Sequence, residues 1–297
     1  MDRPLVFDMG DMLEDVPVPT GSRESSWLTR KLGQRKSTKI YALPTKQVFE
    51  ILDAYLQPDS GSTIKSAAQS IESLLPAPPV PENADCLSDL WILLLEMASQ
   101  VPYDHPAQIK LSYISPVAVR AINNDKDGFH FASRPEGLML VLGEYHFPGG
   151  REGGLFEDID AARWINSNAF VALLASSELP VGAHKGLWSL RDALEEPYSK
   201  KYSDSEISAA AQWILHAGQW LFRWIQVPQE VTSQDEQSTE PGSLWTDGGS
   251  GYSLERWRFW RQGFQSASER EEAKQETKML SSKAVKLMDV LEANYVA

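Results

Sequence analysis

The sequence predicts an all-α protein: a single globular domain of about eight or nine helices around a central Trp-rich helix, with long loop insertions. Three observations predict this fold class. Apolar residues recur at helical spacing in most segments, and the alternation typical of strands is nearly absent. Residues 205–227 are apolar around most of a helical circumference. A helix of that kind belongs in the middle of a core, so this stretch is the predicted central helix.

The N-terminal residues 1–44 are predicted to form a flexible arm, mobile or loosely docked, in front of a domain that spans residues 45–294. The arm mixes acids, Pro, Gly and Ser and shows little periodicity. Trp27 and Leu28 could anchor it to the domain. Its basic run at residues 30–39 fits a solvated arm better than a targeting signal.

The first half of the domain has helical periodicity with clear start and stop signals. Thr45 can cap the first helix, which Pro58 ends. A second helix begins near Ser62, and the pair is predicted to form an antiparallel hairpin. A third covers residues 85–101, and Pro106 suits the first position of a fourth.

Asp104 and His105 precede Pro106 and invite a catalytic interpretation. Asp and His beside a proline at the first helical position are also ordinary helix-start residues. Since no nucleophile accompanies them, the structural role is the favoured interpretation.

Residues 123–158 are predicted to be a long loop insertion, rich in Gly, Asp and Pro, with one strand-like piece at 138–142. Loops of this length are often functional lids or disordered insertions, and both alternatives stay open. Gly149–Gly154 reads GGREGG but lacks the preceding strand and the Lys-Ser/Thr ending of a phosphate-binding loop.

Helices are predicted again over residues 160–174 and 185–195. Asn166 or Asn168 is expected to use its amide, more commonly on a neighbouring backbone than on a ligand, because Asn is otherwise a poor helix-interior residue. Arg191 and Glu195 are spaced for an i,i+4 ion pair.

The C-terminal part begins with residues 228–251, predicted to be a disordered acidic linker because almost nothing there can be buried. Helices follow at YSLERWRFWRQGF and over residues 269–294. The first carries an aromatic stripe bordered by arginines, which fits cation-π packing in the core better than stacking on nucleic acid. The stripe and its arginines are Trp257, Trp260, Phe264, Arg256, Arg258 and Arg261.

One polar line interrupts the central helix. Its four residues follow at spacings of four, three and four, which places them on a single face. They are Gln212, His216, Gln219 and Arg223. This line is the predicted site, although buried polar groups at helical spacing can also be satisfied structural residues.

Composition excludes several function classes. A formal net charge of −13 disfavours a nucleic-acid partner. The acids in the N-terminal stretch disfavour a secretory signal, and polar residues in the longest apolar segment disfavour a membrane span, so a cytoplasmic location is expected. The one cysteine, Cys86, fits a reducing compartment, and the histidines lack metal-ligand spacing. No cofactor or metal is therefore expected.

Five blocks of sequence, in order, carry a family resemblance: VPYDHPAQIKL, WINSNAFVALLASS, GLWSLRDALEE, AAAQWILHAGQWLF and SLERWRFWRQGF. Together they resemble the fungal family called domain of unknown function 3632, over about residues 87–292. The resemblance implies an uncharacterised intracellular helical protein of filamentous fungi and brings no activity with it. The insertion around residues 128–154 and the linker at 228–251 depart from the family pattern.

Two function classes are compatible with these observations. The first is a cofactor-independent enzyme or small-molecule-binding protein of specialised metabolism, with an apolar or aromatic ligand in a pocket lined by the central helix. His216 would transfer a proton, since its unperturbed pKa is closest to neutral. The other predicted ligand-binding residues are Gln212, Gln219, Arg223, Asn168, Arg191 and Trp257. The second class is a non-catalytic interaction or regulatory scaffold, in which these residues bond within a solid core.

Overall fold

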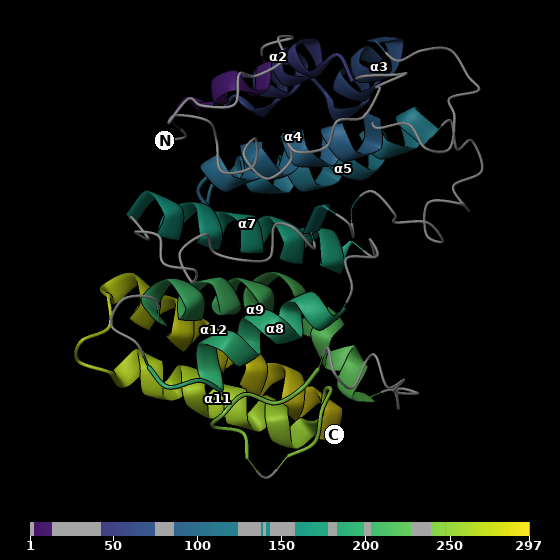
Figure 1. Cartoon of the computed structure of the whole chain (residues 1–297). Coiled ribbons are helices and arrows are strands. Elements are labelled where there is room, and N and C mark those ends of the chain that lie inside the picture. The colour runs from purple at the N-terminus through teal and green to yellow at the C-terminus, as the bar shows by residue number, and fades with distance from the viewer. Residues whose placement is uncertain are drawn as a thin grey trace. The chain divides into compact units, whose positions relative to one another are not determined.

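The computed structural model (Figure 1) describes residues 3–13, 43–74, 86–123, 138, 141–142, 158–177, 183–198, 203–226, 239–246 and 248–296. Within these ranges the chain forms nine α-helices and one short 3-10 helix, and no residue is in a strand. The predicted all-α fold class is confirmed. The chain divides into two compact units, Met1–Gly154 and Leu155–Ala297. The predicted single domain over residues 45–294 stays a prediction.

The first unit contains one 3-10 helix and four of the long helices: η1 (Gly10–Leu13), α2 (Thr45–Leu56), α3 (Ile64–Leu74), α4 (Cys86–Gln100) and α5 (Pro106–Asn123). Helix α5 contacts α2, α3 and α4. Pro106 opens α5 as predicted, since a proline lacks only an N–H that the first turn would leave unpaired. Pro44, not Thr45, is the N-cap residue of α2.

The described part of the N-terminal arm is docked on the first unit. Two glutamines at the ends of helices hold its backbone. Gln57, the C-cap residue of α2, accepts from the Leu5 N–H at 3.0 Å and donates to the Leu5 carbonyl at 3.3 Å. Gln100 of α4 does the same with Asp8, at 2.7 and 2.8 Å. Trp27, Leu28 and the basic run lie outside the described residues.

The strand-like piece expected at residues 138–142 is helical where the structure describes it. Leu138, Val141 and Leu142 are helical and buried. A short apolar run cannot be assigned to a strand or a buried helix by periodicity alone, which is why the prediction was wrong. The rest of the 123–158 insertion after Asn123, up to residue 157, lies outside the described residues, and its interpretation as a lid or a disordered insertion stays open.

The second unit contains the remaining helices: α7 (Asp158–Ser176), α8 (Ala183–Leu194), α9 (Ser203–Gln226), α11 (Leu254–Glu269) and α12 (Gln275–Val296). The last helix therefore begins later than residue 269, where α11 ends. Helix α9 contacts all four others, and Figure 1 shows it between α7 and α11. Its Trp213 and Ile214 are fully buried. Within this unit α9 is the shared neighbour, and its central place in the whole fold stays a prediction.

Glycines allow α8 to approach its neighbours closely. A Cβ added at Gly186 would lie 2.8 Å from Leu221 Cδ2 and 3.0 Å from Trp213 Cε3, both on α9. On the other side, a Cβ at Gly263 of α11 would lie 3.1 Å from Leu194 Cδ2. Helix α8 is thus packed tightly between α9 and α11, which fixes the position of its C-terminal end. No helix in the part of the chain described here is long and apolar enough to cross a membrane.

Candidate functional site

The predicted polar line on α9 runs from the core to the surface. Gln212 is fully buried, and His216 is partly buried one turn further along. Gln219 and Arg223, on the next two turns, are exposed. The structure therefore separates the four residues by depth, although they share a helical face.

Gln212 is the innermost residue of the line. Its side chain is 0% exposed, yet its Oε1 and Nε2 have no hydrogen-bonding partner in the described structure. One turn earlier on α9, Ser208 does have a partner: its hydroxyl bonds to that of Thr277 on α12 at 3.1 Å. A buried amide left unpaired costs about 1–3 kcal/mol, so Gln212 requires an explanation.

His216 lies in a partly dehydrated environment. Burial lowers its pKa below the ordinary value of 6.5. The imidazole is therefore neutral at physiological pH, and a neutral imidazole carries one acceptor nitrogen and one donor. This residue can accept a proton from a bound molecule.

Asn168 joins three helices rather than facing a ligand. Its Oδ1 accepts from the Trp213 indole N–H of α9 at 2.8 Å and from the Ser189 hydroxyl of α8 at 3.0 Å. Its Nδ2 donates to the Trp164 carbonyl of α7 at 2.9 Å. Both lone pairs of Oδ1 are occupied, which favours a structural role. Bonding to a backbone carbonyl was the commoner use expected for this residue type.

Arg191 and Glu195 do not form the predicted i,i+4 pair. Arg191 Nε lies 3.0 Å from the Asp192 carboxylate, and Glu195 bonds to Arg256 instead. Trp257, also a predicted ligand-binding residue, is fully buried and packs edge-on against Phe222 of α9 at 5.0 Å.

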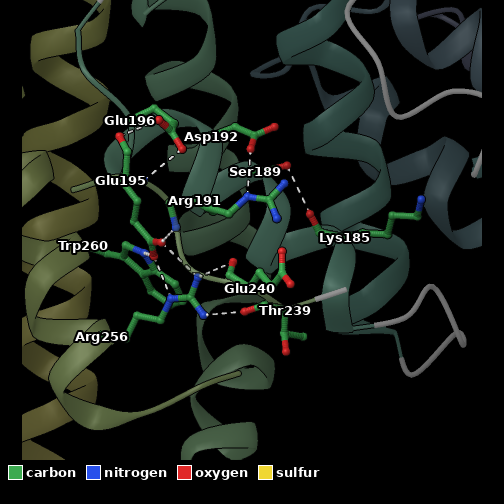
Figure 2. A network of polar contacts seen from close by, with 12 residues as sticks. Lys185, Ser189, Arg191, Asp192, Glu195, Glu196, Thr239, Glu240, Arg256 and Trp260 are labelled. Carbon is green, nitrogen blue, oxygen red and sulfur yellow. Dashed lines mark hydrogen bonds and ion pairs between the residues drawn. The ribbon is translucent and has the colours of Figure 1, made fainter. Parts of the chain in front are cut away.

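A buried ion pair between Glu195 and Arg256 is the strongest polar feature of the second unit, and the sequence analysis missed it (Figure 2). Both side chains are 0% exposed. Arg256 Nε donates to Glu195 Oε1 at 2.7 Å and Nη2 to Oε2 at 2.9 Å, a bidentate geometry. The Trp260 indole N–H donates to Oε1 at 2.6 Å, and the Gly242 N–H donates to Oε2 at 2.7 Å.

The remaining donors of Arg256 hold a chain segment in place. Nη1 donates to the carbonyls of Thr239 at 3.0 Å and Gly251 at 2.8 Å, and Nη2 donates to that of Glu240 at 3.3 Å. The Leu244 N–H also donates to the Glu195 carbonyl at 2.8 Å. All five N–H donors of the guanidinium are thus used.

The described residues 239–246 and 248–251 form a segment, named here the strap, that the prediction of a disordered linker over 228–251 did not anticipate. The prediction rested on the lack of apolar residues. The strap is held by backbone hydrogen bonds to a buried charge pair, which need no apolar side chains. Residues 227–238 lie outside the described structure, so the prediction stands untested there.

The arginines of α11 fall into two kinds. Arg256 lies over the Trp260 ring at 5.4 Å, the cation-π packing expected for this helix. Arg258 and Arg261 instead reach carboxylates of α12, Glu292 and Asp289. One signal in the sequence could have indicated the buried pair: Arg256 lies on the same apolar stripe as Trp260, and an arginine there needs a carboxylate partner.

Two further titratable residues, His105 and Lys185, lie outside the polar line and the buried ion pair. His105 Nδ1 accepts from the Ala107 N–H at 3.1 Å, so it caps the start of α5, as the structural interpretation predicted. Lys185 of α8 is buried, and its ammonium lies 4.4 Å from the Trp188 ring centre. Burial lowers the pKa of Lys185 to about 8. The described residues contain no group of His, Cys, Asp and Glu able to hold a metal ion.

A family model described as protein of unknown function (DUF3632) matches residues 91–264, from the first turns of α4 to the middle of α11. The matched range includes the polar line of α9, Glu195, the strap and Arg256. No curated protein and no solved structure matches the chain.

Proposed function

This chain belongs to the DUF3632 family of proteins of unknown function, and we propose that it is a small-molecule-binding protein whose ligand is held by the polar face of α9. The observation that carries the proposal is the Gln212 carboxamide, which is fully buried with both polar atoms unpaired in the described structure. A ligand with a donor and an acceptor would satisfy both atoms.

The hydrogen bonding of Gln212 differs from that of other buried polar side chains in the second unit. Asn168 and Glu195 are bonded on every acceptor site. Trp245 Nε1, Trp257 Nε1 and Ser281 Oγ also lack a partner, but among the described residues of this unit only Gln212 has two unpaired buried polar atoms. Native proteins leave few buried polar groups unsatisfied, and those few are often functional. A cost of about 1–3 kcal/mol at Gln212 is offset if a ligand supplies the missing hydrogen bonds.

The other residues of the line have roles that follow from their depth. His216, neutral because burial lowers its pKa, accepts a proton or a hydrogen bond from the ligand. Gln219 and Arg223 are exposed and would contact the solvent-facing end of the molecule. The body of the ligand would be apolar or aromatic, as suits a unit rich in Trp. The bonds of Asn168 and Arg191 favour structural roles for those two residues.

In the catalytic form of this proposal the protein is a cofactor-independent enzyme of fungal specialised metabolism that acts in the cytoplasm, with His216 as the proton-transfer residue. Arg223 would orient an anionic or polar group of the substrate. Turnover that depends on His216 would distinguish an enzyme from a carrier, because a carrier requires affinity alone.

The proposal is tested by a metabolite-binding screen with the purified chain and two variants. Gln212→Leu removes both amide atoms at nearly constant volume, and Gln226→Leu is the matched control on an exposed position of the same helix. A ligand that binds the wild type and Gln226→Leu but not Gln212→Leu supports the proposal. Equal binding to all three proteins would contradict it.

A second candidate function, a non-catalytic interaction scaffold, is favoured by a different observation. Ile109, Tyr113 and Val117 are 48%, 59% and 37% exposed and recur every four residues on α5. Exposed apolar residues that align on a helix are typical of protein-binding faces. Loss of a co-purifying partner in Tyr113→Glu, with retention in Gln212→Leu, would support the scaffold and not the ligand-binding protein.

A further inference from the structure

Ser243 lies where the strap contacts Glu195 and Glu196, the two residues that follow α8. Its side chain is exposed. The hydroxyl donates to Glu196 Oε2 at 2.8 Å, and the Ser243 N–H donates to Glu196 Oε1 at 3.1 Å. One carboxylate therefore accepts both hydrogens of this serine, and the acceptor carries a negative charge.

The residues on either side of Ser243 are bound in the same way. The Gly242 N–H donates to the Glu195 carboxylate, and the Leu244 N–H donates to the Glu195 carbonyl. The approach is close, because a Cβ added at Gly242 would lie 2.6 Å from the Glu195 Cβ and 2.8 Å from its carbonyl oxygen. Three consecutive residues thus sit on two adjacent glutamates, with donors facing acceptors throughout.

We propose that Ser243 is a phosphorylation site and that its phosphate shifts the strap to a state released from Glu195 and Glu196 at the end of α8. The inference is independent of the ligand-binding function proposed above. It rests on an exposed serine hydroxyl in an irregular segment, hydrogen-bonded to one carboxylate and next to a second one that is buried.

Phosphorylation weakens the contact between Ser243 and Glu196 in two ways. The phosphoryl group adds a charge of about −1.5 to −2 at neutral pH and removes the hydroxyl hydrogen that Glu196 accepts. Like charges then face each other across the former hydrogen bond. Because Gly242 and Leu244, on either side of Ser243, both bond to Glu195, a shift of Ser243 away from Glu196 is expected to disrupt the contact at residues 242–244 together.

The covalent step requires a nucleoside triphosphate and a protein kinase. Ser243 Oγ attacks the γ-phosphorus, and an Oγ–P bond forms as the bond from that phosphorus to the bridging oxygen breaks. The nucleoside diphosphate leaves, and the hydroxyl proton passes to the base of the kinase. The kinase needs an extended substrate, so it acts on the detached strap, and the phosphate then prevents the strap from binding again.

Ser253, two residues beyond the C-terminal end of the strap, provides a matched control. Its hydroxyl accepts the Arg256 N–H at 3.1 Å and caps the N-terminus of α11. A negative charge is favourable at a helix N-terminus. Phosphorylation at position 243 is therefore expected to release the strap, and phosphorylation at position 253 is expected to leave it bound.

The experiment places phosphoserine at position 243, or at position 253, in the full chain by genetic-code expansion. Amide hydrogen exchange at residues 242–244 is measured by mass spectrometry. At least tenfold faster exchange is expected with phosphoserine at 243, and no acceleration with phosphoserine at 253. Glu196→Gln in the chain with phosphoserine at 243 should recover part of the protection, because it removes the repulsion. Unchanged exchange at 243, or equal acceleration at both positions, would overturn the proposal.

Two further measurements keep the outcome unambiguous. The far-ultraviolet circular dichroism spectrum of the modified chain should remain helical, because the strap contains no helix. If the modified chain instead unfolds, Ser243→Asp is compared with Ser243→Asn in the same exchange assay. Equal exchange rates in these two variants would refute release by charge. Occupancy is measured by phosphopeptide mass spectrometry of the chain isolated from its own cells, treated with phosphatase inhibitors. Phosphate at Ser243 is expected, and its absence under all growth conditions would contradict the assignment.

Discussion

Two buried polar sites in the second unit differ in how many of their donors and acceptors form hydrogen bonds. At the end of α8, Glu195 accepts four hydrogen bonds and Arg256 donates five, and both side chains are fully buried. In the interior of α9, the Gln212 carboxamide is equally buried, and both its polar atoms lack a partner in the described residues.

This difference separates a structural site from a candidate binding site. A saturated ion pair has no donor or acceptor left for a ligand, so its role is to hold the strap and the end of α8 together. An unsaturated amide gains free energy from any molecule that offers a matching donor and acceptor. Chemical reactivity alone would have ranked the two sites in the reverse order, because Glu195 and Arg256 carry the charges.

The largest effect is expected from breaking the saturated site. Glu195→Ala leaves Arg256 buried without its counter-charge, which should cost about 3–5 kcal/mol of unfolding free energy. Urea denaturation followed by circular dichroism measures it. Glu196→Ala is the control, since that residue is partly exposed and should cost less than about 1 kcal/mol. Similar losses in both variants would show that the buried pair contributes no more than a surface contact.

The opposite response is expected at the unsaturated site. Gln212→Leu removes an unpaired amide, so the unfolding free energy should stay constant or rise by about 1–3 kcal/mol. Asn168→Ala, which removes an amide with three bonds, should lower it by a similar amount. Thermal melts of both variants beside the wild type make the comparison. A loss at Gln212→Leu as large as at Asn168→Ala would mean that Gln212 has a buried partner such as an ordered water.

A pH titration sharpens the assignment of His216. Because burial lowers its folded pKa below 6.5, the unfolded chain binds more protons than the folded one as the pH falls through 6.5. The stability that the neutral ring contributes is present above pH 6.5 and is lost as the pH falls towards the folded pKa. His216→Gln should therefore lose less stability than the wild type between pH 7.5 and about 5, at about 1.4 kcal/mol per pKa unit. Parallel curves would show that His216 is not buried in solution.

The smallest effect is expected at the surface. Arg261 binds Asp289 through Nη2 and Oδ2 at 3.0 Å, and this contact lowers the pKa of Asp289. Both side chains are well exposed, so Arg261→Ala should change the unfolding free energy by less than about 1 kcal/mol. Added salt should reduce even that difference. A larger, salt-independent loss would indicate that the pair is part of a buried network.

The helices were accessible from the sequence because their signals are local. Apolar spacing placed α9 at residues 205–227, and the structure has it at Ser203–Gln226. Pro106 correctly predicted the start of α5, and Pro58 the end of α2, for the same reason. The prediction of a strand-like piece at residues 138–142 was wrong because a five-residue apolar run is too short for its period to distinguish a strand from a buried helix.

The strap and the buried pair could not be predicted, since their partners are distant along the chain. Glu195 has a suitable arginine four residues before it, at Arg191, and local spacing selects that one. The structure selects Arg256, which α11 brings to the end of α8. Composition likewise marked residues 239–251 as unable to fold, because it counts apolar side chains and not backbone donors.

The polar line on α9 shows a third limit. Helical spacing correctly aligns Gln212, His216, Gln219 and Arg223, yet it does not state where neighbouring helices end. The depth of each residue depends on those neighbours, so only Gln212 and, in part, His216 are buried.

The contact between Glu195 and Arg256 joins residues 61 positions apart, and the intervening chain contains the whole of α9. Closing a loop of that length has a free-energy cost that grows as about (3/2)RT ln n, so we expect the ion pair to form late in folding. It becomes favourable only after α9 and α11 have brought their ends together. Contacts made after the rate-limiting step govern how fast a protein unfolds and hardly affect how fast it folds. We therefore expect the buried pair to lengthen the lifetime of the native unit rather than to speed its folding.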